Sequence, residues 1–68
     1  MKNKLIHLVT QWDVKQSKTK HHNPYALGIY MQAVDTVMAE IEKGKALDAA
    51  LEAAFDDRLL DFIRKGMA

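Results

Sequence analysis

The chain has 68 residues, no cysteine and a formal net charge of +1 at pH 7. A chain this short forms one small domain that buries about 60% of its unfolded surface. Without cysteine it has neither a disulfide framework nor a thiolate metal site, so oligomerisation is the usual remaining source of stability. The sequence has no run of about 18 apolar residues and no charged-then-apolar leader, which predicts no membrane span, no signal peptide and a cytoplasmic location.

The charge is unevenly distributed along the chain. Residues 1–24 contain five lysines and one aspartate, which gives +4, whereas residues 25–68 contain five basic and eight acidic residues, which gives −3. A basic N-terminal third followed by an acidic remainder is more informative than the small total.

Residues 1–16 form the N-terminal element, and its segment 4–16 fits two periods. If the segment is a helix, one face carries Leu5, Leu8, Val9 and Trp12. If it is a strand, one face carries Ile6, Leu8, Trp12 and Val14. The β-branched residues favour a strand. However, one strand in an otherwise helical chain has no partner except across a dimer axis, so we favour a helix. Trp12 is a core anchor in both interpretations, and His7, between apolar residues, is expected to be a partly buried structural histidine.

Residues 17–23, SKTKHHN, form a basic loop without apolar residues. The side chains that could contact phosphate or nucleic acid are Lys15, Lys18, Lys20, His21 and His22. They directly precede a predicted helix N-terminus, which favours anions. The loop lacks arginine and a glycine-rich turn, so a solvated linker is the alternative. Adjacent histidines rarely bind one ion, and no metal-binding spacing is present, so we expect no metal and no cofactor.

Residues 24–43 predict a long amphipathic helix with Asn23 as N-cap, Pro24 at the first position and Gly44 as the left-handed residue after its end. Gly28 within it hints at a close backbone approach. The apolar face spans roughly 160°, whereas a helix packed on one side needs about 100°. A single neighbour would not cover it. The residues predicted to form the core or a dimer interface are Trp12 of the N-terminal element and, on this helix, Leu27, Tyr30, Met31, Val34, Val37, Met38 and Ile41. The two methionines fill the core or mark an adaptable binding surface.

Residues 45–65 predict a second long helix that ends at Gly66. An i, i+4 apolar row runs along it, joined by Phe62, and consists of Leu47, Leu51, Phe55, Leu59 and Ile63. Asp48, Glu52 and Asp56 lie beside this row and are interpreted as a solvated acidic flank rather than an acid–base pair, because no nucleophile pattern lies near them.

The predicted fold is therefore all-α: a single domain over residues 1–68, with a helical hairpin (24–43 and 45–65) and a shorter N-terminal helix packed on it. Two copies are expected to bury the surplus apolar face as a homodimer. The predicted function is that of a non-enzymatic interaction or regulatory protein that acts through its helix faces on itself or another protein. No set of residues meets the requirements of a nucleophile, its base and an orienting group.

The alternative function is nucleic-acid binding through residues 15–22. If residues 4–14 form a strand, the order strand, helix, helix resembles ribbon-helix-helix repressors, and the resemblance implies DNA binding by a dimer. The loop over 15–23 and the helix over 24–43 are both longer than in that compact motif.

Overall fold

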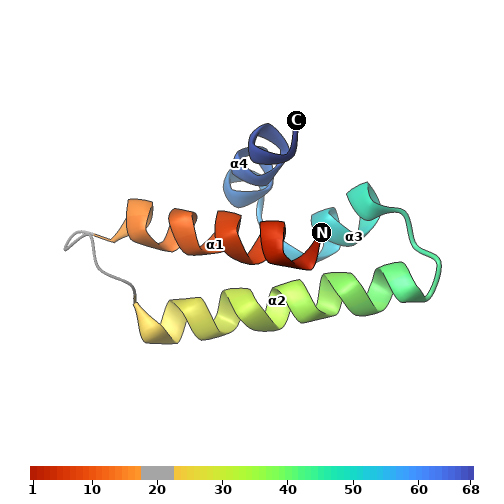
Figure 1. Ribbon diagram of the computed structural model, residues 1–68, viewed down its shortest axis with the longest axis horizontal. Coiled ribbons are helices and arrows are strands. Elements are labelled where there is room, and N and C mark those ends of the chain that lie inside the picture. The colour runs from red at the N-terminus through yellow and green to blue at the C-terminus, as the bar shows by residue number, and fades with distance from the viewer. Residues whose placement is uncertain (18–22) are drawn as a thin grey trace.

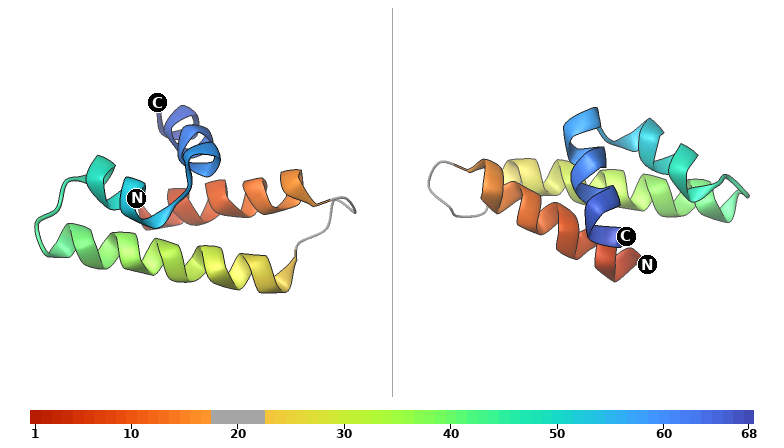
Figure 2. Two further views of the ribbon diagram at one scale, coloured as in Figure 1. Left: turned by 180° about the vertical axis from the view of Figure 1, so that it is seen from behind. Right: turned by 90° about the horizontal axis from the view of Figure 1, so that it is seen from above.

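The computed structural model describes residues 1–17 and 23–68, and the regular structure in these residues is entirely helical. Four helices follow one another in the described part of the chain (Figure 1): α1 (Lys2–Gln16), α2 (Pro24–Glu42), α3 (Leu47–Ala54) and α4 (Asp57–Met67). α1 and α2 lie side by side and antiparallel, α3 returns along the C-terminal part of α2, and α4 crosses over α1 (Figure 2). Backbone contacts join α1 to α2, α2 to α3, α3 to α4 and α4 to α1. The all-α prediction is confirmed.

One hydrophobic core fills the space enclosed by this ring of helices. Each helix contributes apolar side chains to it, and its buried members are Leu5, Leu8, Val9, Trp12, Val34, Val37, Ala50, Leu51, Phe55, Leu59, Leu60 and Ile63. Within residues 1–17 and 23–68, no helix has the length and apolar character needed to cross a bilayer.

The N-terminal element is a helix, so the strand interpretation of residues 4–14 is wrong. The helical period explains the result, because Leu5, Leu8, Val9 and Trp12 are all buried, whereas Ile6 and Val14 of the strand set are only partly so. The expectation for His7 is also wrong. His7 is exposed, because it lies on the side of α1 that faces away from α2.

Both predicted ends of α2 are confirmed. The Asn23 side chain accepts hydrogen bonds from the backbone N–H groups of Tyr25 (3.1 Å) and Ala26 (3.4 Å), and Pro24 occupies the first turn. At the other end Gly44 has a φ of 98°. Its N–H donates to Ile41 O (2.9 Å), and the next N–H donates to Glu40 O (3.1 Å). These two bonds form a Schellman motif, in which the left-handed residue is usually glycine.

The turn after α2 also contains a small ionic cluster around Glu40. Its carboxylate lies 3.2 Å from Lys45 Nζ and 3.5 Å from Lys43 Nζ. The hydrogen bond from Lys45 and the charges of both lysines lower the pKa of Glu40. The resulting stabilisation is present above the ordinary pKa of a glutamate and is lost as the pH falls through the lowered value. Because the pairs are solvent-exposed, this contribution is small.

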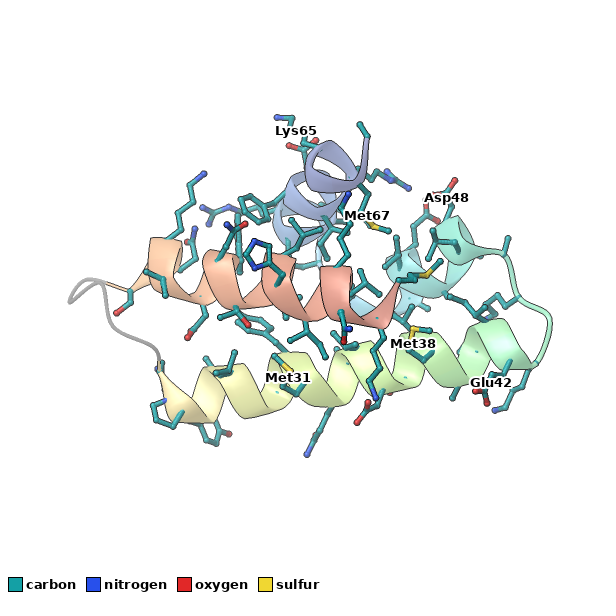
Figure 3. The ribbon with its side chains drawn as sticks, in the orientation of Figure 1. Met31, Met38, Glu42, Asp48, Lys65 and Met67 are labelled. Atoms are coloured by element: carbon teal, nitrogen blue, oxygen red, sulfur yellow. The ribbon has the colours of Figure 1, made fainter. Side chains whose placement is uncertain are left out.

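The wide apolar face of α2 is covered by two helices of the same chain, α1 on one side and α3 on the other. Val34 and Val37 are fully buried. The partly buried residues of this face pack against the core and are Tyr30, Met31, Ala33, Met38 and Ile41. Figure 3 shows Met31 and Met38 directed from α2 towards α1. The width of this face therefore does not itself require a second copy, and self-association stays a prediction.

The predicted single helix over residues 45–65 is wrong, because the chain breaks into α3 and α4 at Phe55 and Asp56. Phe55 is extended (φ −125°, ψ 150°) yet buried, and Asp56 is the N-cap of α4. Its carboxylate accepts a hydrogen bond of 2.9 Å from the Leu59 N–H. The break turns α4 away from α2 and across α1, so the two-helix hairpin consists of α2 and the shorter α3.

We expect Asp56→Ala to lower the free energy of unfolding by about 1 kcal/mol, because a helix N-terminus loses its side-chain cap. Urea titration followed by circular dichroism would measure the change. Asp57→Ala is the matched control, since Asp57 lies in the first turn of α4 without being its cap. It is expected to lower the free energy of unfolding by only a few tenths of about 1 kcal/mol. Equal effects of the two substitutions would contradict the capping role of Asp56.

The two helical glycines also differ from expectation. Gly66 does not end the last helix but lies within α4, where a Cβ atom would overlap Leu8 Cδ2. Gly28 has nothing within 4 Å of the position of a Cβ atom. The close approach predicted at Gly28 is absent there, and the tight contact lies at Gly66 instead, where the backbone of α4 meets the Leu8 side chain.

Candidate functional site

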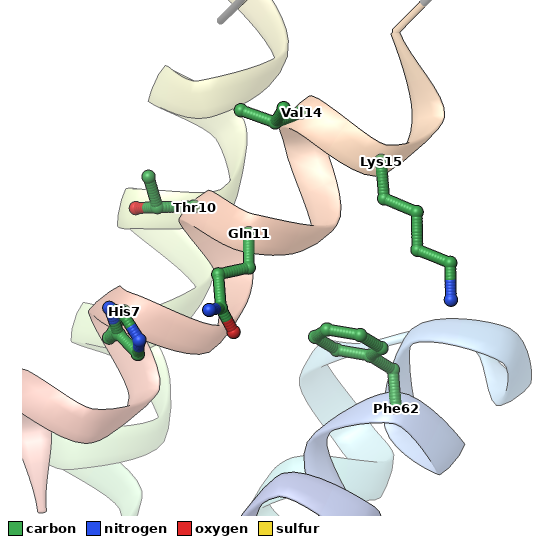
Figure 4. Close-up of a pocket in the computed structure, with 6 residues that line it drawn as sticks. All are labelled: His7, Thr10, Gln11, Val14, Lys15 and Phe62. Carbon is green, nitrogen blue, oxygen red and sulfur yellow. The ribbon is translucent and has the colours of Figure 1, made fainter. Parts of the chain in front are cut away.

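An open groove runs between α1 and α4 and has a volume of about 550 Å³. We call it the α1–α4 groove. Five of its six lining residues come from α1 and one from α4 (Figure 4): His7, Thr10, Gln11, Val14, Lys15 and Phe62. Phe62 and Val14 supply apolar surface, and the Thr10 hydroxyl already donates to Ile6 O at 2.6 Å. The groove thus combines an apolar wall with a polar rim, as many binding sites do.

An aromatic pair with two cations lies beside the groove, where α4 crosses α1. The ring centroids of Trp12 and Phe62 lie 5.3 Å apart with an interplanar angle of 54°. Lys15 Nζ lies 5.4 Å from the centre of the Phe62 ring, and the guanidinium carbon of Arg58 lies 5.9 Å from the centre of the Trp12 ring. Both distances are within the range of cation–π attraction, which holds each charge over a ring without neutralising it.

A second hollow of about 270 Å³ adjoins the α1–α4 groove and shares Lys15 and Phe62 with it. Arg58, Asp61 and Lys65 also line this hollow. The Asp61 carboxylate lies 3.0 Å from Lys65 Nζ, so these two charges offset each other. The charges left on this surface are those of Lys15 and Arg58, and the surface is therefore basic.

Asp13 is the one buried charged residue of the described ranges, with 3% of its surface exposed. Its Oδ2 accepts a hydrogen bond of 2.9 Å from the backbone N–H of Asn23. This bond joins the C-terminal turn of α1 to the N-cap of α2, so Asp13 fixes the distance between two helix ends. A carboxylate is also favoured near a helix N-terminus.

The residues predicted to contact phosphate are only partly placed. Lys15 lies in the α1–α4 groove. Lys18, Lys20, His21 and His22 lie outside the residues that the structure describes. Among the predicted core or dimer residues, Trp12, Val34 and Val37 are buried, and the partly buried remainder is Leu27, Tyr30, Met31, Met38 and Ile41.

The three carboxylates of the predicted acidic flank have three different surroundings. Asp48 is exposed, Glu52 forms a 2.9 Å ion pair with Arg64, and Asp56 caps α4. Over residues 1–17 and 23–68, no group of three or more histidine, aspartate or glutamate side chains is arranged to hold a metal ion.

The sequence did not identify Arg58, Gln11 or the exposed position of His7 as parts of a site. The i, i+4 spacing of Arg58 and Phe62 places both on one side of α4, but only the crossing of α4 over α1 brings them to Lys15. Comparisons with protein-family models, with curated proteins and with solved structures find no match to this chain.

Proposed function

We propose that this chain is a non-enzymatic interaction protein that binds a partner protein in the α1–α4 groove. The observation that supports the proposal is the pair of cations held over Phe62 and Trp12 beside an open, partly apolar groove. A concave surface with apolar walls and a few placed polar groups is the usual form of a binding site. Partly buried aromatic and arginine side chains are also the residues that contribute most to binding energy at interfaces.

Site-specific photo-crosslinking tests this function. A photoreactive amino acid at Gln11, which is exposed and lines the groove, is expected to form an adduct with one partner protein in the native host. The same amino acid at Asp48, which is exposed on α3, is the matched control and is expected to form none. Absence of an adduct at Gln11, or the same adduct at both positions, would contradict the proposal.

We also propose that the chain self-associates through an exposed pair of apolar side chains on α2. Tyr25 is 80% exposed and Ile29 is 50% exposed, and they lie one turn apart on α2. Gly28 beside them leaves the helix backbone accessible. An exposed apolar pair of this kind is a suitable contact for a second copy.

Light scattering after size exclusion is expected to give about twice the 7.7 kDa chain mass. Ile29→Asp is expected to give the monomer mass, because it places a charge in the apolar contact. Thr36→Asp, at an exposed polar position of the same helix, is the control and should leave the dimer intact. A parent chain that is monomeric at tens of micromolar would exclude the homodimer.

Nucleic-acid binding is the second candidate, favoured by the unneutralised charges of Lys15 and Arg58. Its ribbon-helix-helix form is excluded, because the segment that would supply the ribbon is helix α1. A helical form of nucleic-acid binding stays a prediction, as does the cytoplasmic location expected from the sequence.

A further inference from the structure

Within the described residues, Lys15 in the α1–α4 groove and Arg58 in the adjoining hollow have no carboxylate within ion-pair distance. Most basic side chains in the described ranges lie within ion-pair distance of an acid, and these are Lys2, Lys43, Lys45, Arg64 and Lys65. Lys15 and Arg58 instead lie over aromatic rings, 5.4 Å and 5.9 Å from the ring centres. Their hydrogen-bonding capacity is therefore available to a ligand, and the rings limit the conformations that binding must fix.

The surface between these cations is apolar. Phe62 is half-buried, packs on Trp12 and forms the wall of the groove with Val14. A ligand that neutralised the cations alone would leave this apolar wall in water. The better complement carries both carboxylates and an apolar side chain.

We infer that the α1–α4 groove receives an acidic, amphipathic peptide segment of the partner protein. Its carboxylates pair with Lys15 and Arg58, and an apolar side chain packs on Phe62 and Val14. This inference rests on the proposed function, since it names the chemistry of the partner for the same groove. Charge complementarity of this kind sets partner choice and the rate of association more than it sets total affinity.

The same geometry favours a peptide over a nucleic acid. A base would have to stack on a whole face of the Phe62 ring, over which the Lys15 ammonium group lies, whereas a smaller apolar side chain can pack on the edge of the ring and on Val14.

Selection from a random-peptide display library at about 150 mM salt tests the inference. We expect the selected peptides to be rich in aspartate and glutamate next to an apolar residue, and to lose binding to Gln11→Trp, which fills the groove. Their affinity is expected to fall about tenfold on Lys15→Gln/Arg58→Gln, as for two partly exposed charge pairs. The control Lys2→Gln/Lys43→Gln changes the net charge equally, away from the groove, and should alter affinity less than about twofold. Circular dichroism would establish that all variants keep the parent helicity.

The other outcomes separate the inference from the proposed function. Peptides that require an open groove but are not acidic, and that bind Lys15→Gln/Arg58→Gln normally, would overturn the inference and leave the proposed function standing. If no selected peptide is affected by Gln11→Trp, both are overturned. Submicromolar binding of a fluorescent mixed-sequence oligonucleotide at about 150 mM salt, lost in Lys15→Gln/Arg58→Gln, would assign the groove to nucleic acid and overturn the inference.

Discussion

Leu51→Asp and Val34→Asp are each expected to unfold the protein. The two side chains are 2% and 1% exposed, and they lie on α3 and α2 within the single core. A carboxylate placed there has no partner, and removing an unpaired charge from water costs several kcal/mol. The loss of the apolar side chain adds about 2–5 kcal/mol. A domain of this size has a total free energy of unfolding of only roughly 3–10 kcal/mol. The cost of either substitution is therefore as large as this total or larger.

Far-UV circular dichroism and a urea titration would measure this effect. Ala49→Asp is the matched control, because Ala49 is exposed in the first turn of α3, where an acidic residue suits the helix dipole. It is expected to change the free energy of unfolding by less than about 1 kcal/mol. If Leu51→Asp and Val34→Asp melted like the parent chain, the packing of α2 and α3 would be assigned wrongly.

The sequence predicts individual helices well where the local signals agree. In α1 the face containing Leu5, Val9 and Trp12 has the helical period and is buried as a unit. In α2 the N-cap, the first-turn proline and Gly44 each satisfy a local backbone requirement, and all three are found in place. These features depend on residues within one or two turns of each other, which is why a single sequence is enough to identify them.

The break between α3 and α4 has a much weaker local signal. Leu51, Phe55, Leu59 and Ile63 keep an i, i+4 spacing through the break, and all four are buried. A continuous helix and a broken one therefore present the same apolar pattern. The only local mark is Asp56, which has no glutamate three residues later to complete a capping box and no neighbouring glycine or proline.

The α1–α4 groove could not be predicted, because it follows from that break. With residues 45–65 as one helix, Arg58 and Phe62 would continue along α2. The turn at Asp56 instead directs α4 across α1 and brings Phe62 to Lys15 (Figure 4). A site formed by side chains 47 positions apart has no signature in the spacing of either segment.

The two helical glycines provide the last test of this arrangement, because substitution by alanine should have opposite effects at the two positions. At Gly28 the space is open, so Gly28→Ala is expected to raise the free energy of unfolding by about 0.5–1 kcal/mol, the usual gain in helix propensity.

At Gly66 the Cβ of an alanine would overlap Leu8 Cδ2 and lie 3.3 Å from Leu8 Cγ. Leu8 is 5% exposed, so its side chain must shift within the core to make room, and we expect Gly66→Ala to lower the free energy of unfolding by about 1–3 kcal/mol. Urea titrations of Leu8→Ala, Gly66→Ala and the double variant form a mutant cycle. Since Leu8→Ala removes the overlapping atoms, the double variant should be more stable than the sum of the single effects by about 0.5–3 kcal/mol. Strict additivity would show that α4 does not cross α1 at this contact, and the α1–α4 groove would lose its structural basis.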